Sequence, residues 1–328
     1  MLNRWIRFWF EPTRPTDLAI SRLVFFAGLF IVYSREDFSA WGAVSPAFWM
    51  PLPLFSALHL GQLSVGELQI LQTLWRVALL SSAIGLFARA SMWVAAVLGF
   101  YLLGLPHNFG QTFHFDALLV LTCVVLAFSR AADAWSIDAL VGRTAPVPDG
   151  RSGEYTWPVR MIWVAMSLVF VAAGLAKARH GGLEWIWSDN MRILLMRAAY
   201  HVSDADPLGG IGLWVAGHAW MARGLAGLSL AIELTFGLAL VSRRARALLV
   251  PAAFCMLVGI RVIMGPTFGA FLLANVFWVP WEALGARVAS WRTRLRASAV
   301  PAGQDDIAAE DSEGRACAQE MFVEHLKS

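Results

Sequence analysis

The chain has 328 residues, of which 58% are hydrophobic and 15% are charged. Soluble domains contain about 45–50% apolar and about 25% charged residues, so this composition indicates a membrane-embedded protein. The net charge of +3 comes from arginines beside apolar runs, which argues against a nucleic-acid partner. Cys123, Cys255 and Cys317 have no metal-ligand spacing, so we expect neither a disulfide framework nor a metal site.

Apolar segments along the chain predict eight membrane spans, because a helix needs about twenty mostly apolar residues to cross a bilayer. The N-terminal stretch before them is too polar for a signal peptide, so we expect the first span to remain as an anchor. The sequence therefore predicts an all-α, polytopic membrane helix bundle of about eight transmembrane helices with outer interfacial helices. The expected spans are 17–35, 68–88, 90–106, 114–130, 157–177, 225–241, 247–264 and 267–284.

The arginines between the spans predict the orientation. With the N-terminus inside, the outer loops 36–67, 107–113 and 265–266 contain no Lys or Arg, whereas every inner segment contains arginine. The outer segment 178–224 contains both signs of charge, but long loops constrain topology less. The pattern predicts a plasma (inner) membrane protein with both termini in the cytoplasm.

Two outer segments differ from simple loops. Residues 38–60 combine aromatic residues with prolines, and residues 183–199 predict one amphipathic helix in the membrane interface. We expect the two segments to cover one outward-facing cavity. Residues 1–297 are predicted to form the transmembrane domain, and the polar residues 298–328 a disordered cytoplasmic tail. No inverted repeat or matched pair of broken helices indicates a transporter.

Ionisable residues inside the predicted spans cost at least about 2.5–3.5 kcal/mol each near the bilayer centre, so they usually face the bundle interior. We expect Glu233 to lie deep in the bundle and to pair with an arginine, and Asp116 to pair with an arginine as well. The residues expected to form structural ion pairs are Arg22, Arg76, Glu233 and Arg261.

Lys177 ends the apolar segment LVFVAAGLAKARH and is one of only two lysines in the chain. A buried ammonium loses hydration and its pKa falls, which suits a general base. Alternatively, Lys177 extends to the lipid headgroups or neutralises a carboxylate. Direct contact with Glu233 would hold the lysine charged and would count against its use as a base.

His107 and His114 flank the outer turn GLPHNFGQTFHFDA, which is expected on the same face as Lys177. Histidine can transfer protons or hydrogen-bond a ligand. The alternatives are a hydrated turn residue for His107 and a structural residue at the start of a span for His114.

The segment FVAAGLAKARHGGLEWIWSDN resembles the core motif of the HTTM family, the membrane domain related to vitamin K-dependent gamma-carboxylase. That motif is an apolar helix ending in Gly-x-x-Lys, followed by an aromatic turn and an interfacial helix. QTFHFDALLVL resembles the family's turn in which a histidine opens the next helix. The resemblance extends over roughly residues 10–285 and includes LAISRLVFFAG and IELTFGLAL.

The resemblance implies that Lys177 is the catalytic base and that His114 supports it. It also implies that the two side chains line one cavity, about 10 Å or less apart. The implied substrate is a reduced quinone similar to vitamin K hydroquinone, which would enter from the lipid. The carboxylase's propeptide-binding region has no expected counterpart here, so peptide carboxylation is not expected. The residues implied to bind substrate are His107, Asn108, Gln111, Arg179, His180 and Trp185.

An alternative is a non-catalytic membrane assembly or immunity factor that binds a partner through its outer surface. In that case, changes at Trp185, Trp187 and Phe48 would matter more than a change at Lys177. If the protein is an enzyme of the first kind, Lys177→Ala abolishes activity and Lys177→Arg does not restore it.

Overall fold

A computed structural model describes residues 2–110, 115–145, 150–201, 209–264 and 269–299. Within these ranges the regular structure is helical, apart from one isolated β-bridge between Thr13 and Ser152. The predicted all-α fold is therefore confirmed. The chain divides into two compact units, Met1–Val279 and Pro280–Ser328. The second unit contains helix α16 (Trp281–Ala299), and the expected tail beyond residue 299 lies outside the described ranges.

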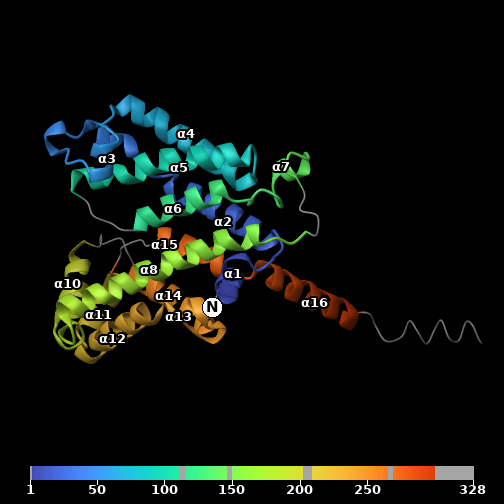
Figure 1. Cartoon of the computed structure of the whole chain (residues 1–328). Coiled ribbons are helices and arrows are strands. Elements are labelled where there is room, and N and C mark those ends of the chain that lie inside the picture. Colours follow the sequence, from blue (N-terminus) through green and yellow to red (C-terminus); the bar gives the residue numbers. More distant parts are fainter. Residues whose placement is uncertain (1, 111–114, 146–149, 202–208, 265–268, 300–328) are drawn as a thin grey trace, which may run out of the picture. The chain divides into compact units, whose positions relative to one another are not determined.

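Four helices from the first half of the chain pack side by side (Figure 1). They are α2 (Thr16–Tyr33), α4 (Val65–Ile84), α5 (Ala88–Gly104) and α6 (Phe115–Phe128). Helix α4 contacts both α2 and α5, and α5 contacts α6. Their facing sides supply most of the large buried apolar core of the unit.

Helices from the second half form a second group around α8 (Thr156–Gly181). Helix α12 (Ala219–Thr235) packs along α8 and also contacts α14 (Arg243–Met264). Two shorter helices, α10 (Asn190–His201) and α11 (Gly209–Ala216), contact each other as well as α12 and α14. Contacts between α8 and α6 join the two groups.

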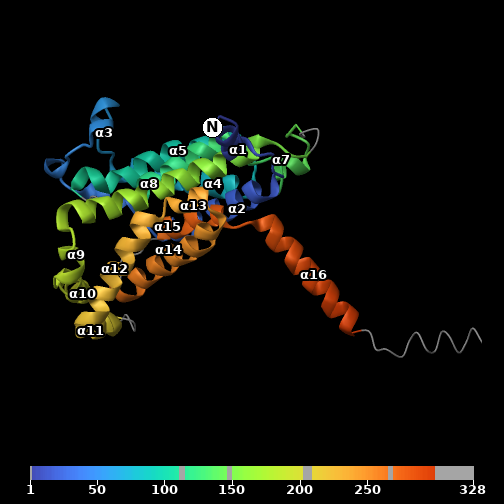
Figure 2. The same ribbon diagram turned by 60° about the horizontal axis from the view of Figure 1, so that its bottom comes forward.

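Short helices connect the long ones. Helix α3 and helix α10 lie at one end of the Met1–Val279 unit, and α7 lies at the opposite end (Figures 1 and 2). The short elements are α1 (Leu2–Phe10), η1 (Phe38–Ala43), η2 (Pro46–Phe48), α3 (Pro53–Ala57), η3 (Leu105–Phe109), α7 (Ile137–Leu140), η4 (Gly153–Tyr155), α9 (Glu184–Trp187), α13 (Leu238–Val241), α15 (Gly269–Ala274) and η5 (Asn275–Trp278).

Four helical segments of the described residues are long and apolar enough to cross a membrane: Thr16–Tyr33, Ala88–Phe109, Gly153–Gly181 and Arg243–Met264. They fit an integral membrane protein, and the expected count of eight spans is not confirmed.

Three predicted helices are interrupted. The expected span 225–241 is divided between α12 and α13. The expected span 267–284 is wrong as one helix, because regular structure stops at Val279–Pro280, where proline lacks the N–H that continues a helix. The expected single helix at 183–199 is also wrong. It is two helices, and the Ser188 hydroxyl accepts a bond from the Asn190 N–H at the start of α10 (3.3 Å).

The tight turn between α4 and α5 is held by a carboxylate from α7. Gly85 ends α4 with a φ of 71°, a conformation that glycine adopts without strain. Asp138 accepts bonds from the N–H groups of Phe87 (3.1 Å) and Ala88 (2.7 Å), which begin α5, and Arg143 pairs with the same carboxylate (3.3 Å). Burial opposes ionisation of Asp138, but these donors prevail and its pKa lies below the usual 3.8.

Candidate functional site

Lys177 lies near the end of α8, where this helix closely approaches α12. A Cβ atom added to Gly174 would lie 2.9 Å from the backbone nitrogen of Leu234 and 3.0 Å from the Cβ of Glu233. Glycine therefore allows the two backbones to meet one helical turn before the lysine. In this position the Lys177 ammonium forms an ion pair and hydrogen bond with Glu233 Oε1. The Gly-x-x-Lys element thus joins α8 to a carboxylate on α12.

This ion pair corrects the expected partner of Glu233. The prediction that Glu233 pairs with an arginine is wrong, because the close approach at Gly174 brings Lys177 to it first. The Glu233 side chain is only 8% exposed, and that of Lys177 is 25% exposed. A carboxylate in direct contact with an ammonium forms a favourable ion pair with it. The contact therefore counts against Lys177 acting alone as a free base.

The ion pair lies in the wall of a cavity of about 490 Å³, which we call the Lys177 cavity. Its other walls are almost entirely apolar and come from α10, α12 and α14. The ring of Trp185, from α9, lies 5.3 Å from the Lys177 ammonium. The remaining lining residues are Met191, Leu194, Leu195, Leu225, Leu228, Ser229, Ile232, Ala252, Cys255, Met256, Gly259, Ile260, Ile263 and Met264.

Two polar atoms of the residues around this cavity have no partner among the described residues. Glu233 Oε2 and the indole nitrogen Nε1 of Trp185 are both buried and make no hydrogen bond. A buried polar atom without a partner costs about 1–3 kcal/mol, so native structures rarely leave one unsatisfied. One is an acceptor and the other a donor, so a single hydroxyl group of a ligand has the chemistry to satisfy both.

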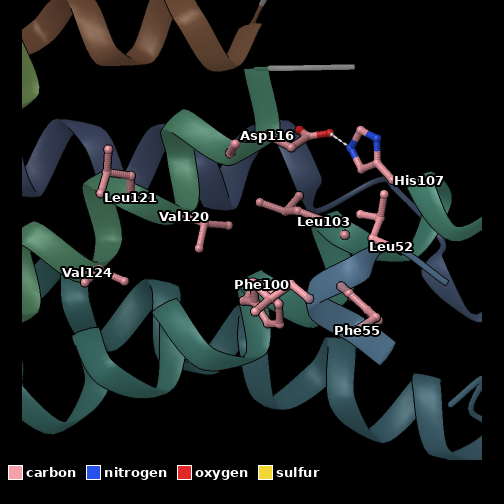
Figure 3. Close-up of a pocket in the computed structure, with 12 residues that line it drawn as sticks. Leu52, Phe55, Phe100, Leu103, His107, Asp116, Val120, Leu121 and Val124 are labelled. Atoms are coloured by element: carbon pink, nitrogen blue, oxygen red, sulfur yellow. Dashed lines mark hydrogen bonds and ion pairs between the residues drawn. The ribbon is translucent and has the colours of Figure 1, made fainter. Parts of the chain in front are cut away.

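A second cavity of about 560 Å³, the His107 cavity, lies between η3, α3, α5 and α6 (Figure 3). His107 Nε2 lies 3.2 Å from Asp116 Oδ2, and the Tyr33 hydroxyl donates to Asp116 Oδ1 (3.2 Å). Figure 3 shows His107 and Asp116 facing each other beside apolar side chains such as Leu103 and Val120. The prediction that Asp116 pairs with an arginine is wrong, because η3 places a histidine beside it.

Asn108, which follows His107, is fully buried and forms hydrogen bonds that hold neighbouring chain segments together. Its Oδ1 accepts a bond from the Leu52 N–H (2.8 Å), and its Nδ2 donates to the Gly104 carbonyl (2.9 Å). Its own carbonyl accepts from the Met50 N–H (2.7 Å). These bonds hold the segment before α3 against η3. Asn108 lines neither cavity, so its predicted contact with substrate has no support in this geometry.

The other predicted residues separate into three groups. Trp185 lines the Lys177 cavity, as a substrate-binding residue should. Arg179 and His180 are exposed and line neither cavity. His114 and Gln111 lie outside the described residues, so the distance between Lys177 and His114 stays a prediction.

The described residues of the two outer segments line two different cavities and not the expected single one. Leu52 and Phe55 from the first segment line the His107 cavity, whereas Trp185 and Met191 from the second line the Lys177 cavity. The two cavities share no lining residue. Each outer segment packs against the helices of its own half of the chain, which separates the two sites.

Arg22 and Arg76, which were predicted to form ion pairs, donate hydrogen bonds to backbone carbonyls among the described residues. Arg22 is fully buried and its Nη2 donates to the carbonyl of Trp135 (2.5 Å). Arg76 Nη2 donates to the carbonyl of Glu36 (2.5 Å) beyond the end of α2. Arg261 is exposed in the last turn of α14. Arg22 and Arg76 therefore fix chain segments and have no role at Glu233.

Residues of α14 in the cavity wall were not predicted from sequence. Ala252, Met256, Gly259 and Ile263 recur at spacings of four, three and four, which place them on one helix face. In a membrane helix that is apolar all round, this face cannot be distinguished from the lipid-facing side. Among the described residues, no group of three His, Cys, Asp or Glu side chains could hold a metal ion.

Comparison with known proteins gives one match. The model of the HTTM domain matches residues 10–271 of the chain. No curated protein and no solved structure matches it.

Proposed function

Because the chain belongs to the HTTM family, we propose that it is a membrane protein that binds a lipid-soluble molecule of the reduced-quinone class in the Lys177 cavity. The proposal rests on one observation: a buried acceptor, Glu233 Oε2, and a buried donor, Trp185 Nε1, lack partners beside an otherwise apolar cavity. A quinol combines an apolar body with hydroxyl groups on its aromatic ring. Its hydroxyl can donate to Glu233 and accept from Trp185.

The ion pair suggests how the site would handle a proton. With Lys177 charged, Glu233 is the basic partner of the pair, and its free Oε2 would take the proton from the ligand hydroxyl. Glu233 becomes neutral, the ligand oxygen becomes anionic, and the Lys177 ammonium exchanges one anionic partner for the other. The number of buried charges does not change in this step, so it avoids a new desolvation cost. In this proposal Lys177 stabilises the oxyanion and Glu233 accepts the proton.

Access from the lipid also supports this function. Cys255 of α14 lines the cavity and is exposed, and its neighbour Phe254 is 44% exposed. The cavity therefore reaches the apolar outer surface of α14, through which an apolar tail can enter. We also propose that the protein lies in the plasma membrane with both termini in the cytoplasm. We do not propose that it carboxylates peptides.

The test compares the binding of vitamin K hydroquinone and its oxidised quinone to the full chain, purified in a mild detergent. The hydroquinone should bind about tenfold more tightly, because the quinone has no hydrogen to donate to Glu233 and one hydrogen bond is worth roughly 1–1.5 kcal/mol. Mass spectrometry of co-purified lipids should detect a quinone. Equal affinity of the two forms would refute the proposed recognition.

A partner-binding function is favoured by one different observation. Trp187 and Phe48 are 62% and 63% exposed, although both are large apolar residues. They lie in the two outer segments, where a partner could cover them. If this function is correct, Trp187→Ala and Phe48→Ala abolish the biological effect and leave hydroquinone binding unchanged. A biological effect retained in both variants would argue against it.

A further inference from the structure

Three arginines gather where α1, α13 and the first turns of α8 and α14 meet. The guanidinium carbons of Arg160 and Arg246 each lie 4.2 Å from the ring centre of Trp163. Arg243 begins α14 and lies within electrostatic range of both. We call Arg160, Arg243 and Arg246 the arginine cluster. The sequence pattern does not indicate a functional role for any of these three arginines.

The cluster carries more positive charge than its described partners neutralise. The one ion pair described for it joins Arg160 Nη2 to Glu11 at 3.8 Å, and the Glu11 side chain is 56% exposed. Arg160 is itself only 15% exposed, and its Nη1 is buried without a hydrogen-bond partner. Three neighbouring guanidinium groups repel each other, so an anion bound among them would relieve the repulsion.

Fold stability explains only part of this arrangement. Arg246 donates from Nε to the Ala239 carbonyl (2.9 Å) and from Nη2 to the Leu240 carbonyl (3.2 Å), and so holds the end of α13. Arg243 is exposed and makes no described hydrogen bond, and Arg160 retains its unpartnered nitrogen. The free donors of the cluster match the oxygens of a phosphate group, which arginine binds through two N–H groups at once.

The surface around the cluster is strongly apolar. Val241 is 82% exposed, Leu248 is 70% exposed and Leu238 is 53% exposed on α13 and α14. Phe10, the last residue of α1, is 54% exposed. A membrane protein covers such residues with acyl chains. We therefore expect an anion that binds here to be the headgroup of a lipid, whose apolar chains contact these exposed side chains.

We propose that the arginine cluster binds the phosphate of an anionic phospholipid. The expected topology places the N-terminal end of α8 on the cytoplasmic side, where anionic lipids are recognised by basic pockets between helices. The site shares no residue with the Lys177 cavity, so it holds a lipid whether or not that cavity binds a quinol.

The experiment measures lipid binding to the full chain in mild detergent by native mass spectrometry and by thermal unfolding. Phosphatidylglycerol should bind several-fold more tightly than phosphatidylcholine and should raise the unfolding temperature. Arg160→Gln should weaken phosphatidylglycerol binding about tenfold. Arg243→Gln should weaken it several-fold and, because Arg243 is exposed, should leave the fold intact. Retained phosphatidylglycerol selectivity in both variants would overturn the proposal.

Two controls distinguish lipid binding at the arginine cluster from general charge attraction and from binding of a free anion. Arg89→Gln removes the same charge from an exposed arginine at the start of α5, outside the cluster, and should leave binding unchanged. An equal loss in Arg89→Gln and Arg243→Gln would show general charge attraction and overturn the site. Inorganic phosphate should stabilise the protein far less than phosphatidylglycerol at the same phosphate concentration. Equal stabilisation would assign the cluster to a free anion and overturn the lipid assignment.

Discussion

The Lys177 cavity and the His107 cavity are similar in size and in their apolar walls, but they differ in how their polar groups are satisfied. At the His107 cavity, both carboxylate oxygens of Asp116 have partners, one in Tyr33 and one in His107. At the Lys177 cavity, one oxygen of Glu233 and the indole N–H of Trp185 have none among the described residues. Cavity size therefore does not distinguish the two, whereas the unsatisfied hydrogen-bonding groups are the reason why we propose ligand binding at the Lys177 cavity.

The largest expected effect comes from removing the cation at the Lys177 cavity. Lys177→Ala leaves the buried Glu233 carboxylate without its counter-charge and should lower the free energy of unfolding by about 3–5 kcal/mol. Thermal unfolding in detergent measures this. His107→Ala should cost much less, because Asp116 keeps the Tyr33 hydroxyl.

The matched control is the double variant Lys177→Ala with Glu233→Leu. It removes both charges and should recover much of the stability lost in Lys177→Ala. A double variant that is no more stable than the single one would show that the buried charge is not the cause.

The next effect comes from Asn108, which lies next to the His107 cavity without lining it and holds chain segments together. Asn108→Leu removes the acceptor for the Leu52 N–H and the donor to the Gly104 carbonyl. Leaving these buried groups unpaired should cost about 2–3 kcal/mol of unfolding free energy, with no change in hydroquinone affinity. Normal stability together with weakened hydroquinone binding would instead identify Asn108 as a ligand contact and contradict its structural role.

Trp185 and Trp187 offer a matched pair two residues apart on α9. Trp185→Phe keeps an aromatic ring but removes the unpartnered N–H, and should weaken hydroquinone binding about tenfold. Trp187→Phe changes an exposed residue in the same way and should have no effect on binding. Equilibrium binding to the purified proteins checks both. Equal losses in the two variants would indicate a general disturbance of α9.

The sequence predicts the helical fold and several candidate site residues because both leave local patterns. Composition and apolar runs identify membrane helices, and the Gly-x-x-Lys element identifies Lys177. The partner of Glu233 could not be predicted, because it depends on the close approach of α8 and α12 at Gly174, which is a contact between distant segments. The separation of the two cavities likewise depends on how each outer segment packs, and residue spacing does not encode it.

The smallest expected effect lies outside both cavities, at Asp138. Its pKa in the folded protein is below 3.8, so its bonds to α5 stabilise the fold fully above that pH and are lost as the pH falls through the folded pKa. Asp138→Asn should lower stability at neutral pH by about 1 kcal/mol and remove this acid dependence. Unfolding followed from pH 7 down to pH 2 in both proteins tests this. An unchanged acid dependence in the variant would contradict the assignment.

The central claim, that the Lys177 cavity holds the ligand and the His107 cavity does not, is tested most directly by photolabelling. A vitamin K hydroquinone analogue with a photoreactive group in its tail is cross-linked to the full chain, and the labelled peptides are identified by mass spectrometry. The structure predicts labels on α14 around Cys255 and Met256, competed by unmodified hydroquinone. Competed labels on α6 around Val120 and Val124 would place the ligand in the His107 cavity and contradict the claim.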